Sequence, residues 1–433
     1  MRLLTYFALV LSLLLSGCVE DECMETVHYQ SYQPVLVSAA DWRSTDFTYE
    51  AASEVCEPSG FYVYGDYLFI VDRNAGLHIF DNRDNDAPRP LSFLPIPGGQ
   101  GIAVRNDILY VSQYLDLLAF DLTDPREPAF LHRTEDVFEL YSVFAGELAY
   151  TGEYIVEYLP TDEVMELSCS EARARESSFW ADGIFFASTS ITNNMSGSRS
   201  AGFTTEVVGQ GGSLARFTIS NGTLYAVDQQ SLRTFSLENP AEPAFVGTTA
   251  LGWDIETIFP YKDQLYIGST TGMHIYDVRN PLRPQHLSTF EHVLSCDPVV
   301  VQDDVAYVTM WGGSDCGNQA DQLIVLDVSE PRRPTELQTI PMQQSHGLGV
   351  KENRLYLCSG TLGIKVFALG EDGRLGPLLT TEPDFNARDI IVRHDRPELI
   401  VFGWEQAGIR QYDYTEAGEV IAVSDISICP VEL

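Results

Sequence analysis

Polar residues that could bind a ligand or take part in catalysis recur along this sequence at intervals of roughly 40 to 50 residues, with one double interval. This is the spacing of a structural repeat. Each stands just before a short run of strand-forming residues. The set comprises Gln100, Glu139, Arg216, Glu256, Asp297, His346, Arg388 and Asp389. Carboxylates can hold a hydrated cation such as calcium, an Arg can pair with an anion, and a His can exchange a proton near neutral pH. The set therefore predicts a ligand or cation site if the fold brings its members together.

The elements that must position these residues are short β-strands in groups of four. In one unit the segments GIAVRN, ILYVSQ, DLLAFDL and AFLHRT alternate apolar and polar residues, and a turn at Asn106-Asp107 separates the first two. A period of about 41 residues with four strands is typical of a β-propeller blade, whereas a helical solenoid would need helical spacing. All innermost strands of a propeller begin at one mouth of its central channel. We therefore expect the polar set to form a ring around that mouth.

The number of blades is less firmly indicated than the fold. The sequence favours one all-β propeller over residues 31–433 with eight four-stranded blades, and seven or nine blades remain open. The uncertainty comes from residues 169–212, which we interpret as a loop insertion in the ring. The segment YQPVLVSA around Val35 is interpreted as a stray fourth strand that could pair with the last blade and close the ring.

One turn motif recurs several times in the sequence. LAFDLTDPREPAFL places Asp121 at the end of a third strand, Pro125 in the turn and Pro128 at the start of the fourth strand. The carboxylate can accept hydrogen bonds from turn N–H groups, and a Pro is tolerated at the start of an outer edge strand. The same pattern recurs in TFSLENPAEPAFV, IYDVRNPLRPQHL and VLDVSEPRRPTEL, so the turn belongs to the blade.

These motifs also carry a family resemblance. QLIVLDVSEPRRP, LLAFDLTDPREP and MHIYDVRNPLRP resemble the LVIVD repeat, a propeller-type repeat of bacterial surface and secreted proteins. GGSLARFTI and SCDPVVV resemble the lipoprotein branch of that family. The resemblance covers most of residues 59–425. It implies a fold and an exported location, and it implies no settled activity.

The amino terminus has the proportions of an export signal. Arg2 precedes an apolar run that is too short to span a bilayer, and LSGC resembles the lipobox of bacterial lipoproteins. The resemblance implies a lipoprotein signal peptide at residues 1–17, lipid attachment to Cys18 and an acidic tether at residues 18–30. It also implies anchoring in the outer membrane or at the cell surface of a Gram-negative bacterium. An ordinary secretory signal is the alternative.

The eight cysteines fit an exported protein with disulfides. Cys296 and Cys316 fall in one repeat unit and are predicted to pair. Cys56 precedes the first blade and Cys429 follows the last, so a bond between them would hold the ring closed. Cys358 lies on a strand and is predicted to be a buried thiol. The remaining two, Cys23 and Cys169, have no predicted partner.

Composition and missing motifs narrow the function. The net charge of −36 argues against nucleic acid as a partner, because such contacts need Lys and Arg. The sequence contains no HExxH, no GxSxG and no phosphate loop with its Lys, and the Gly-rich GQGGSLA at Gly209 is interpreted as a flexible re-entry into the ring. No cofactor is predicted, although a bound cation remains possible.

Three hypotheses follow. The first is a non-enzymatic, lipid-anchored binding module for an unknown protein or small-molecule ligand. The second is a hydrolase or lyase whose active site at the channel mouth uses Glu256, Asp297, His346 and Arg388. In the third, side chains plug the channel and contacts are made on the outer blades. Catalysis would require two titratable groups within reach of one substrate, so geometry discriminates between the first two.

Overall fold

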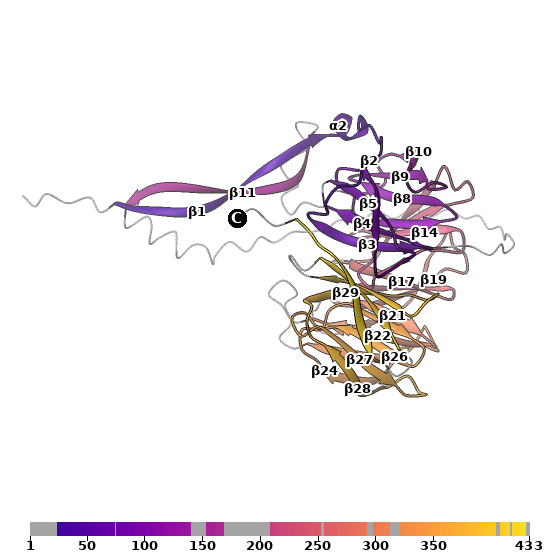
Figure 1. Ribbon diagram of the computed structural model, residues 1–433. Helices are drawn as coiled ribbons and strands as arrows, with labels where there is room; N and C mark the ends of the chain where they lie inside the picture. The colour runs from indigo at the N-terminus through magenta and orange to yellow at the C-terminus, as the bar shows by residue number, and fades with distance from the viewer. Residues whose placement is uncertain are drawn as a thin grey trace, which may run out of the picture. The chain divides into compact units, whose positions relative to one another are not determined.

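The computed structural model describes residues 24–73, 75–139, 153–168, 208–252, 255–291, 298–311, 321–403, 408–415 and 418–429. The chain divides into two compact units. One contains most of a ribbon formed by the paired strands β1 (Met24–Ser38) and β11 (Glu153–Ser168) (Figure 1). The other contains the remaining strands and the short helix α2 (Ala39–Arg43).

The larger unit is a β-propeller with seven four-stranded blades in the described part of the chain. Blades 1 and 2 contain β3 (Pro58–Tyr64), β4 (Tyr67–Asp72), β5 (Gly76–Asp81), β6 (Arg89–Pro95), β7 (Ile102–Arg105), β8 (Ile108–Gln113), β9 (Asp116–Asp121) and β10 (Ala129–Thr134). Blades 3 and 4 contain β13 (Phe217–Ser220), β14 (Thr223–Val227), β15 (Ser231–Ser236), β16 (Ala244–Ala250), β17 (Ile255–Tyr261), β18 (Gln264–Ser269), β19 (Gly272–Asp277) and β20 (Gln285–Glu291).

The other three blades follow the same order. They contain β21 (Val299–Gln302), β22 (Val305–Met310), β23 (Gln322–Asp327), β24 (Thr335–Pro341), β25 (Leu348–Lys351), β26 (Arg354–Cys358), β27 (Ile364–Leu369), β28 (Leu375–Glu382), β29 (Ala387–Val392), β30 (Glu398–Gly403), β31 (Ile409–Tyr414) and β32 (Val420–Ile426). Two short strands extend blade 1, β2 (Glu50–Ala51) at its outer edge and β12 (Gln210–Gly211) at its inner edge.

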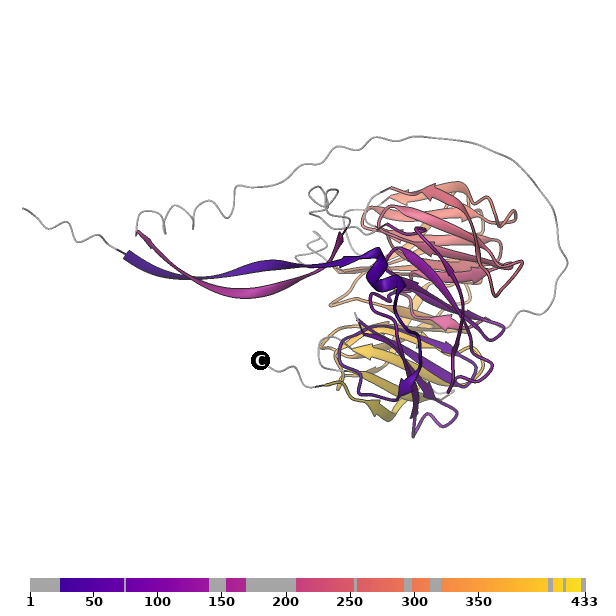
Figure 2. The ribbon, with the colours of Figure 1, turned by 90° about the horizontal axis from the view of Figure 1, so that it is seen from above.

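Each blade buries its apolar side chains against the next blade. The middle strands are nearly continuous runs of buried residues, whereas the outer strands alternate or are exposed, as expected for a sheet that is covered on both faces only near its centre. The last blade packs on the first, with Ile391 and Ile400 in the same apolar cluster as Leu68 and Ile70. Figure 2 shows the last blade beside the first, so the ring closes.

The all-β propeller is confirmed, and the blade count is seven rather than the favoured eight. The repeat spacing also predicts a blade around Leu148, and the difference in blade number lies in that unit. Its described part, Glu153–Ser168, forms β11 and pairs with β1 instead of forming a four-stranded sheet. Val35, expected to pair with the last blade, lies in β1. Residues 24–30, expected in the acidic tether, also lie in β1, and most of the expected insertion at 169–212 lies outside the described residues.

The repeated turn joins neighbouring blades. In blades 1, 2, 4 and 5 an Asp ends the third strand and accepts a hydrogen bond from the main-chain N–H two residues later, as at Asp121 with Thr123 (2.7 Å) and Asp327 with Ser329 (2.9 Å). The carbonyl of the first turn Pro accepts a hydroxyl from the preceding blade. Tyr110 donates to Pro240 at 2.8 Å and Tyr225 donates to Pro281 at 2.7 Å. The turn therefore recurs because it completes a contact at each blade boundary.

A covalent bond closes the ring. Cys56 and Cys429 form the predicted disulfide across a sequence separation of 373 residues. A parallel bridge between Val55 and Ile428 accompanies it. Cys358 is the predicted buried thiol. The other predicted pair, Cys296 with Cys316, lies outside the described residues, as do Cys18, Cys23 and Cys169.

The residue ranges given above contain no helix that is both long and apolar enough to cross a membrane. The short helix α2 instead serves as an anchor for the chain that enters the propeller. Its Trp42 and Arg43 donate hydrogen bonds to the buried carboxylate of Asp116 in blade 2, at 3.1 and 2.9 Å. Arg133 pairs with the same carboxylate at 2.8 Å, so Asp116 is fully engaged in holding structure.

Candidate functional site

The central channel is crossed by the chain itself. We call residues 208–215 the channel segment, and we call the end of the channel where the innermost strands begin the start end. β12 in this segment pairs with Tyr62 and Val63 of the innermost strand of blade 1. Further along, the Ala215 carbonyl accepts a hydrogen bond from the Ile258 N–H of blade 4 at 3.0 Å. The segment thus runs from one side of the channel to another.

Glycines make this crossing possible. A Cβ atom at Gly209 would lie 2.2 Å from the Tyr62 ring, and one at Gly212 would lie 2.1 Å from Asp389 Oδ2. Both distances are shorter than any tolerable contact, so only Gly fits at these two positions. The GQGGSLA motif was interpreted as a flexible re-entry. Its glycines instead allow the backbone to approach the channel wall closely.

Asp389 holds the channel segment in place. Its Oδ1 accepts hydrogen bonds from the Ser213 hydroxyl at 2.7 Å and the Ser213 N–H at 3.0 Å, and its Oδ2 accepts from the Leu214 N–H at 3.2 Å. Burial raises the pKa of the Asp389 carboxyl to about 6, opposed in part by these hydrogen bonds. The Ser213 hydroxyl in turn accepts from the Leu348 N–H at 2.9 Å. Asp389 is therefore a structural clamp between blade 7 and the channel segment.

Two smaller groups of predicted residues lie at the start end. Burial lowers the pKa of the Arg216 guanidinium, and the Glu256 carboxylate partly opposes this shift. The Arg388 guanidinium helps to lower the pKa of His346. Burial lowers the pKa of Arg388, and the Asp389 carboxylate partly opposes that shift. The described members of the predicted set thus interact in pairs. Asp297 lies outside the described residues.

The other two predicted residues have separate surroundings. Gln100 is exposed, and its main-chain N–H donates to the Ser112 hydroxyl at 3.3 Å. Glu139 is exposed and pairs with Arg233 of blade 3 at 2.9 Å. Residues 140–152, which follow Glu139, lie outside the described part of the chain.

His346 does not titrate near neutral pH, contrary to the expectation from its sequence position. Burial, with a smaller contribution from Arg388, lowers the pKa of its imidazole to about 4. Its ring packs edge-on against Trp311, with centroids 4.7 Å apart. A neutral, packed imidazole is a poor general base at neutral pH, because its proton affinity is too low.

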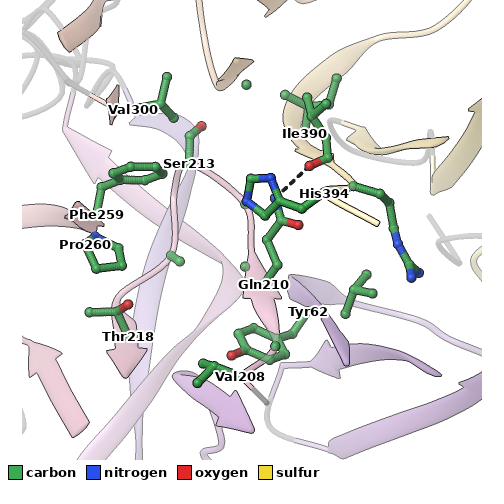
Figure 3. Close-up of a pocket in the computed structure, with 18 of the residues that line it drawn as sticks. Tyr62, Val208, Gln210, Ser213, Thr218, Phe259, Pro260, Val300, Ile390 and His394 are labelled. Atoms are coloured by element: carbon green, nitrogen blue, oxygen red, sulfur yellow. Dashed lines mark hydrogen bonds between the residues drawn. The ribbon is translucent and has the colours of Figure 1, made fainter. Parts of the chain in front are cut away.

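A cavity of about 390 Å³ lies along the remainder of the channel. The innermost strands of blades 1, 3, 4, 5, 6 and 7 contribute to its wall, and the channel segment forms another side (Figure 3). It reaches Gly65 and residues 393–395, which follow the last residues of their innermost strands, and we call this end the finish end. The wall is mainly apolar, with rings from Tyr62, Phe217 and Phe259.

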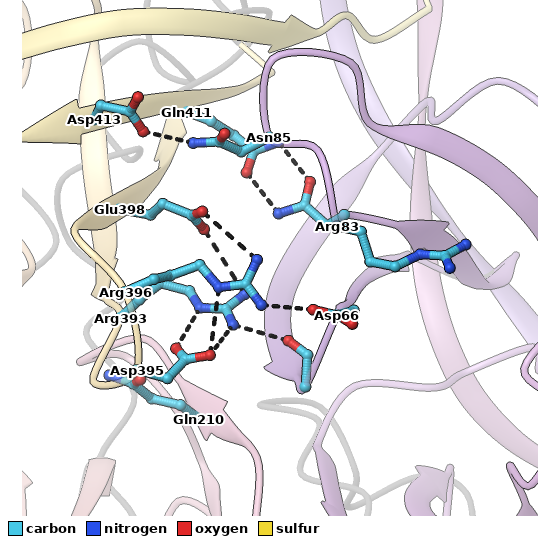
Figure 4. Close-up of polar contacts among 12 residues, drawn as sticks. Asp66, Arg83, Asn85, Gln210, Arg393, Asp395, Arg396, Glu398, Gln411 and Asp413 are labelled. Atoms are coloured by element: carbon cyan, nitrogen blue, oxygen red, sulfur yellow. Dashed lines mark hydrogen bonds and ion pairs between the residues drawn. The ribbon is translucent and has the colours of Figure 1, made fainter.

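The charged side chains at the finish end pair with one another. Arg393, almost fully buried, binds Asp395 at 2.7 Å and donates to the Gly65 carbonyl at 2.8 Å (Figure 4). Arg396 lies 3.6 Å from Glu398 and also pairs with Asp66. These contacts connect blade 7 to blade 1. Their charges are compensated within the wall, which leaves the cavity without an exposed excess charge from this group.

Two polar side chains of the cavity wall escaped the sequence prediction. Gln210 donates from Nε2 to the Val392 carbonyl at 2.7 Å, and His394 follows blade 7's innermost strand (Figure 3). Burial, with help from Lys351, lowers the pKa of His394. Among the described residues, no group of three or more His, Cys, Asp or Glu side chains is arranged to hold a metal ion.

Comparison with known families supports the repeat. Residues 59–82, which include β4 and β5 of blade 1, match the family model described as the LVIVD repeat. The chain carries an LVIVD repeat. The match falls on the first unit, where the turn after Asp81 is lengthened, and the motifs quoted above extend the pattern to other blades of this LVIVD-repeat propeller. A search of curated proteins finds no match.

Solved structures share the fold of this LVIVD-repeat propeller at low sequence identity. The periplasmic gluconolactonase PpgL of Pseudomonas aeruginosa is 10% identical, with a TM-score of 0.55 over 88% of this chain and 96% of that chain. A protein described as a candidate 6-phosphogluconolactonase of Bacteroides fragilis is also 10% identical, with a TM-score of 0.54 over 86% and 96%. At this identity the likeness concerns the fold alone.

The sequence around Gln210 and His394 contains features that indicate a position at the cavity wall, but each feature also has another interpretation. Gln210 stands inside the Gly-rich segment, where the absence of side chains on its neighbours indicates close backbone approach. His394 comes two residues after an innermost strand, one strand length beyond the column that was inspected. In this LVIVD-repeat propeller both ends of the innermost strands face the channel mouths, so the strand-end position of His394 is itself a signal.

Proposed function

We propose that this LVIVD-repeat propeller is a non-catalytic binding module, held at a membrane by lipid on Cys18, with its ligand in the finish-end cavity. The observation that carries the proposal is the contrast between the two ends of one channel. Asp389 holds Ser213 and Leu214 of the channel segment at the start end, whereas the cavity extends along the channel segment to the finish end. A cavity of this size lies within the range of about 300–1,000 Å³ that is usual for small-molecule sites.

The cavity wall lacks a pair of groups suited to acid–base catalysis. Its carboxylate, Asp395, pairs with Arg393, and the hydrogen bond from that guanidinium lowers the Asp395 pKa to about 2. This leaves His394 as the lining side chain that could exchange a proton at ordinary pH. One such group supports ligand orientation better than hydrolysis, which needs an acid and a base in complementary roles.

The alternative is a hydrolase or lyase at the start end. The fold shared with a gluconolactonase keeps this alternative worth testing, although fold alone does not carry an activity. Glucono-1,5-lactone is the natural first substrate, and its hydrolysis can be followed by proton release. We expect the purified protein to match the uncatalysed rate. Turnover that falls at least a hundredfold in both Glu256→Gln and His346→Gln would favour the hydrolase and overturn the proposal.

The anchor is tested separately. We expect wild-type protein expressed in a Gram-negative host to incorporate labelled palmitate and to sediment with membranes, because several acyl chains at about 0.8 kcal/mol per buried methylene give firm attachment. Cys18→Ala should abolish both. Cys23→Ala is the matched control, since it removes a nearby thiol but leaves the lipobox. A Cys18→Ala protein that still sediments with membranes would contradict the lipid anchor.

A further inference from the structure

The cavity wall offers a paired donor and acceptor. Gln210 donates a hydrogen bond from Nε2 to the Val392 carbonyl, and within the described chain nothing donates a hydrogen bond to its Oε1. The His394 imidazole, likewise without a described hydrogen-bond partner, lines the same cavity. Figure 3 draws both side chains at the wall of the cavity. A neutral imidazole carries one N–H donor and one acceptor nitrogen, so a hydroxyl group can donate to Gln210 and accept from His394.

The surroundings select against charge on the ligand. Arg393 and Asp395 neutralise each other at 2.7 Å, and Arg393 is almost fully buried. The pKa of the His394 imidazole is lowered by partial desolvation and by Lys351, which favours its neutral form, and the residue stays exposed at the cavity mouth. A ligand with its own charge would lose hydration without gaining a counter-charge from the wall, which is costly in an apolar site.

The walls select for a flat apolar body. Tyr62, Phe217 and Phe259 contribute three aromatic rings from three different blades, and Val208, Val300 and Pro260 add apolar surface. The Tyr62 hydroxyl oxygen is engaged with the main-chain N–H of Val104. Apolar contact of this kind supplies most of the binding free energy of a small ligand, while a few polar groups fix its orientation.

We propose that the finish-end cavity binds a small uncharged molecule with a flat apolar body and a single hydroxyl group, oriented by Gln210 and His394. The inference rests on the proposed function and specifies its ligand class. The hydroxyl donates to Gln210 Oε1 and accepts from the His394 ring N–H, while the body lies among the rings of Tyr62, Phe217 and Phe259.

A series of naphthalenes tests the class directly. 2-Naphthol is uncharged at pH 7 and carries the hydroxyl, 2-methoxynaphthalene lacks the donor, and 2-naphthoate and 2-naphthylmethylammonium carry opposite charges on the same body. Binding to the full-length protein is measured by calorimetry and ligand fluorescence. We expect 2-naphthol to bind, the methoxy compound to bind roughly tenfold more weakly, as one lost hydrogen bond predicts, and the charged pair not to bind measurably.

Two variants place the binding in this cavity. Thr218→Trp fills the cavity and should abolish binding of 2-naphthol, whereas Thr381→Trp, on the exposed outer strand of blade 6, should leave it unchanged. His394→Phe keeps a ring of similar size and should remove the preference for 2-naphthol over its methyl ether. His132→Phe, on the outer strand of blade 2, is the control for a His lost elsewhere.

The outcomes separate the ligand class from the function. If a charged naphthalene binds to wild type and is lost in Thr218→Trp, the cavity is a binding site and the uncharged class is wrong. If 2-naphthol and its methyl ether bind equally and His394→Phe changes nothing, the orienting roles of Gln210 and His394 are refuted. If no member of the series binds in a way that Thr218→Trp abolishes, both the ligand class and the finish-end cavity as its site are overturned, while the lipid-anchor experiment still stands.

Discussion

The start end and the finish end of the channel are built by the same strands but differ in how they are filled. At the start end, buried Asp389 accepts several hydrogen bonds from the channel segment, and charged neighbours lie in pairs. At the finish end, the wall encloses about 390 Å³ and its charges cancel. The comparison teaches that a recurring polar column can reflect the need to satisfy backbone groups and close a channel, while the cavity reaches the opposite ends of the same strands, outside that column.

The largest expected effect on stability comes from removing the Asp389 carboxylate, which tests whether this residue has a structural role at the start end. Asp389→Ala leaves the donors of Ser213 and Leu214 unsatisfied in a buried place, so we expect unfolding free energy to fall by about 3 kcal/mol. Denaturant titration measures it. Asp384→Ala, at an exposed carboxylate, should change stability by less than about 0.5 kcal/mol. A loss in Asp389→Ala no greater than that of the control would contradict the clamp.

The fold was predictable because its signals are local and repeated. The Asp121 turn needs only residues within seven positions of one another, and the ring-closing pair of Cys56 and Cys429 follows from their places outside the first and last blades. The region around Leu148 was not predictable, because its strand pattern is compatible with a blade and its partner β1 is more than a hundred residues away.

The site was less predictable for a related reason. The column containing Glu256 and His346 follows from the repeat frame, and the structure places these two residues at or just before the start of an innermost strand. The clamp between Ser213 and Asp389 joins residues 176 positions apart, and no local pattern signals such a contact. Glycine in GQGGSLA has two physical meanings, freedom or close approach, and only the position of Tyr62 and Asp389 decides between them.

The pH dependence of stability sharpens the assignment of Asp389. Its folded-state pKa of about 6 lies above the value of 3.8 expected when unfolded, so the folded state holds the proton more tightly. The resulting stabilisation is fully present below pH 3.8 and is lost as pH rises through about 6, with a size of about 3 kcal/mol. Asp389→Asn should remove this contribution, which is seen as the difference between the unfolding curves of wild type and variant from pH 4 to 7. Parallel curves would exclude a raised pKa at Asp389.

His346 should show the opposite sign. Its folded-state pKa of about 4 lies below the value of 6.5 expected when unfolded. The contribution is fully present above pH 6.5 and is lost as pH falls through about 4, with a size of up to about 3 kcal/mol. His346→Gln should therefore lose less stability than wild type on acidification from pH 6.5 to 4, measured by denaturant titration at each pH. His132→Gln on the outer strand of blade 2 is the control; equal behaviour of the two variants would contradict a buried neutral His346.

The smallest expected effect concerns Glu139 and the possibility of a cation at the start end. Its carboxylate is 70% exposed and pairs with Arg233 at 2.9 Å, while Arg233 also binds Asp228 at 3.0 Å. An exposed ion pair contributes roughly 0–1 kcal/mol, and Arg233 keeps a second carboxylate when Glu139 is neutralised. Glu139→Gln should therefore change unfolding free energy by less than about 1 kcal/mol. The same measurement with added calcium sharpens the result, because a Glu139 that helped to hold a cation would make calcium stabilise wild type more than the variant. We expect calcium to act equally on both proteins, and a calcium-dependent stabilisation that disappears in Glu139→Gln would restore a cation site at the start end.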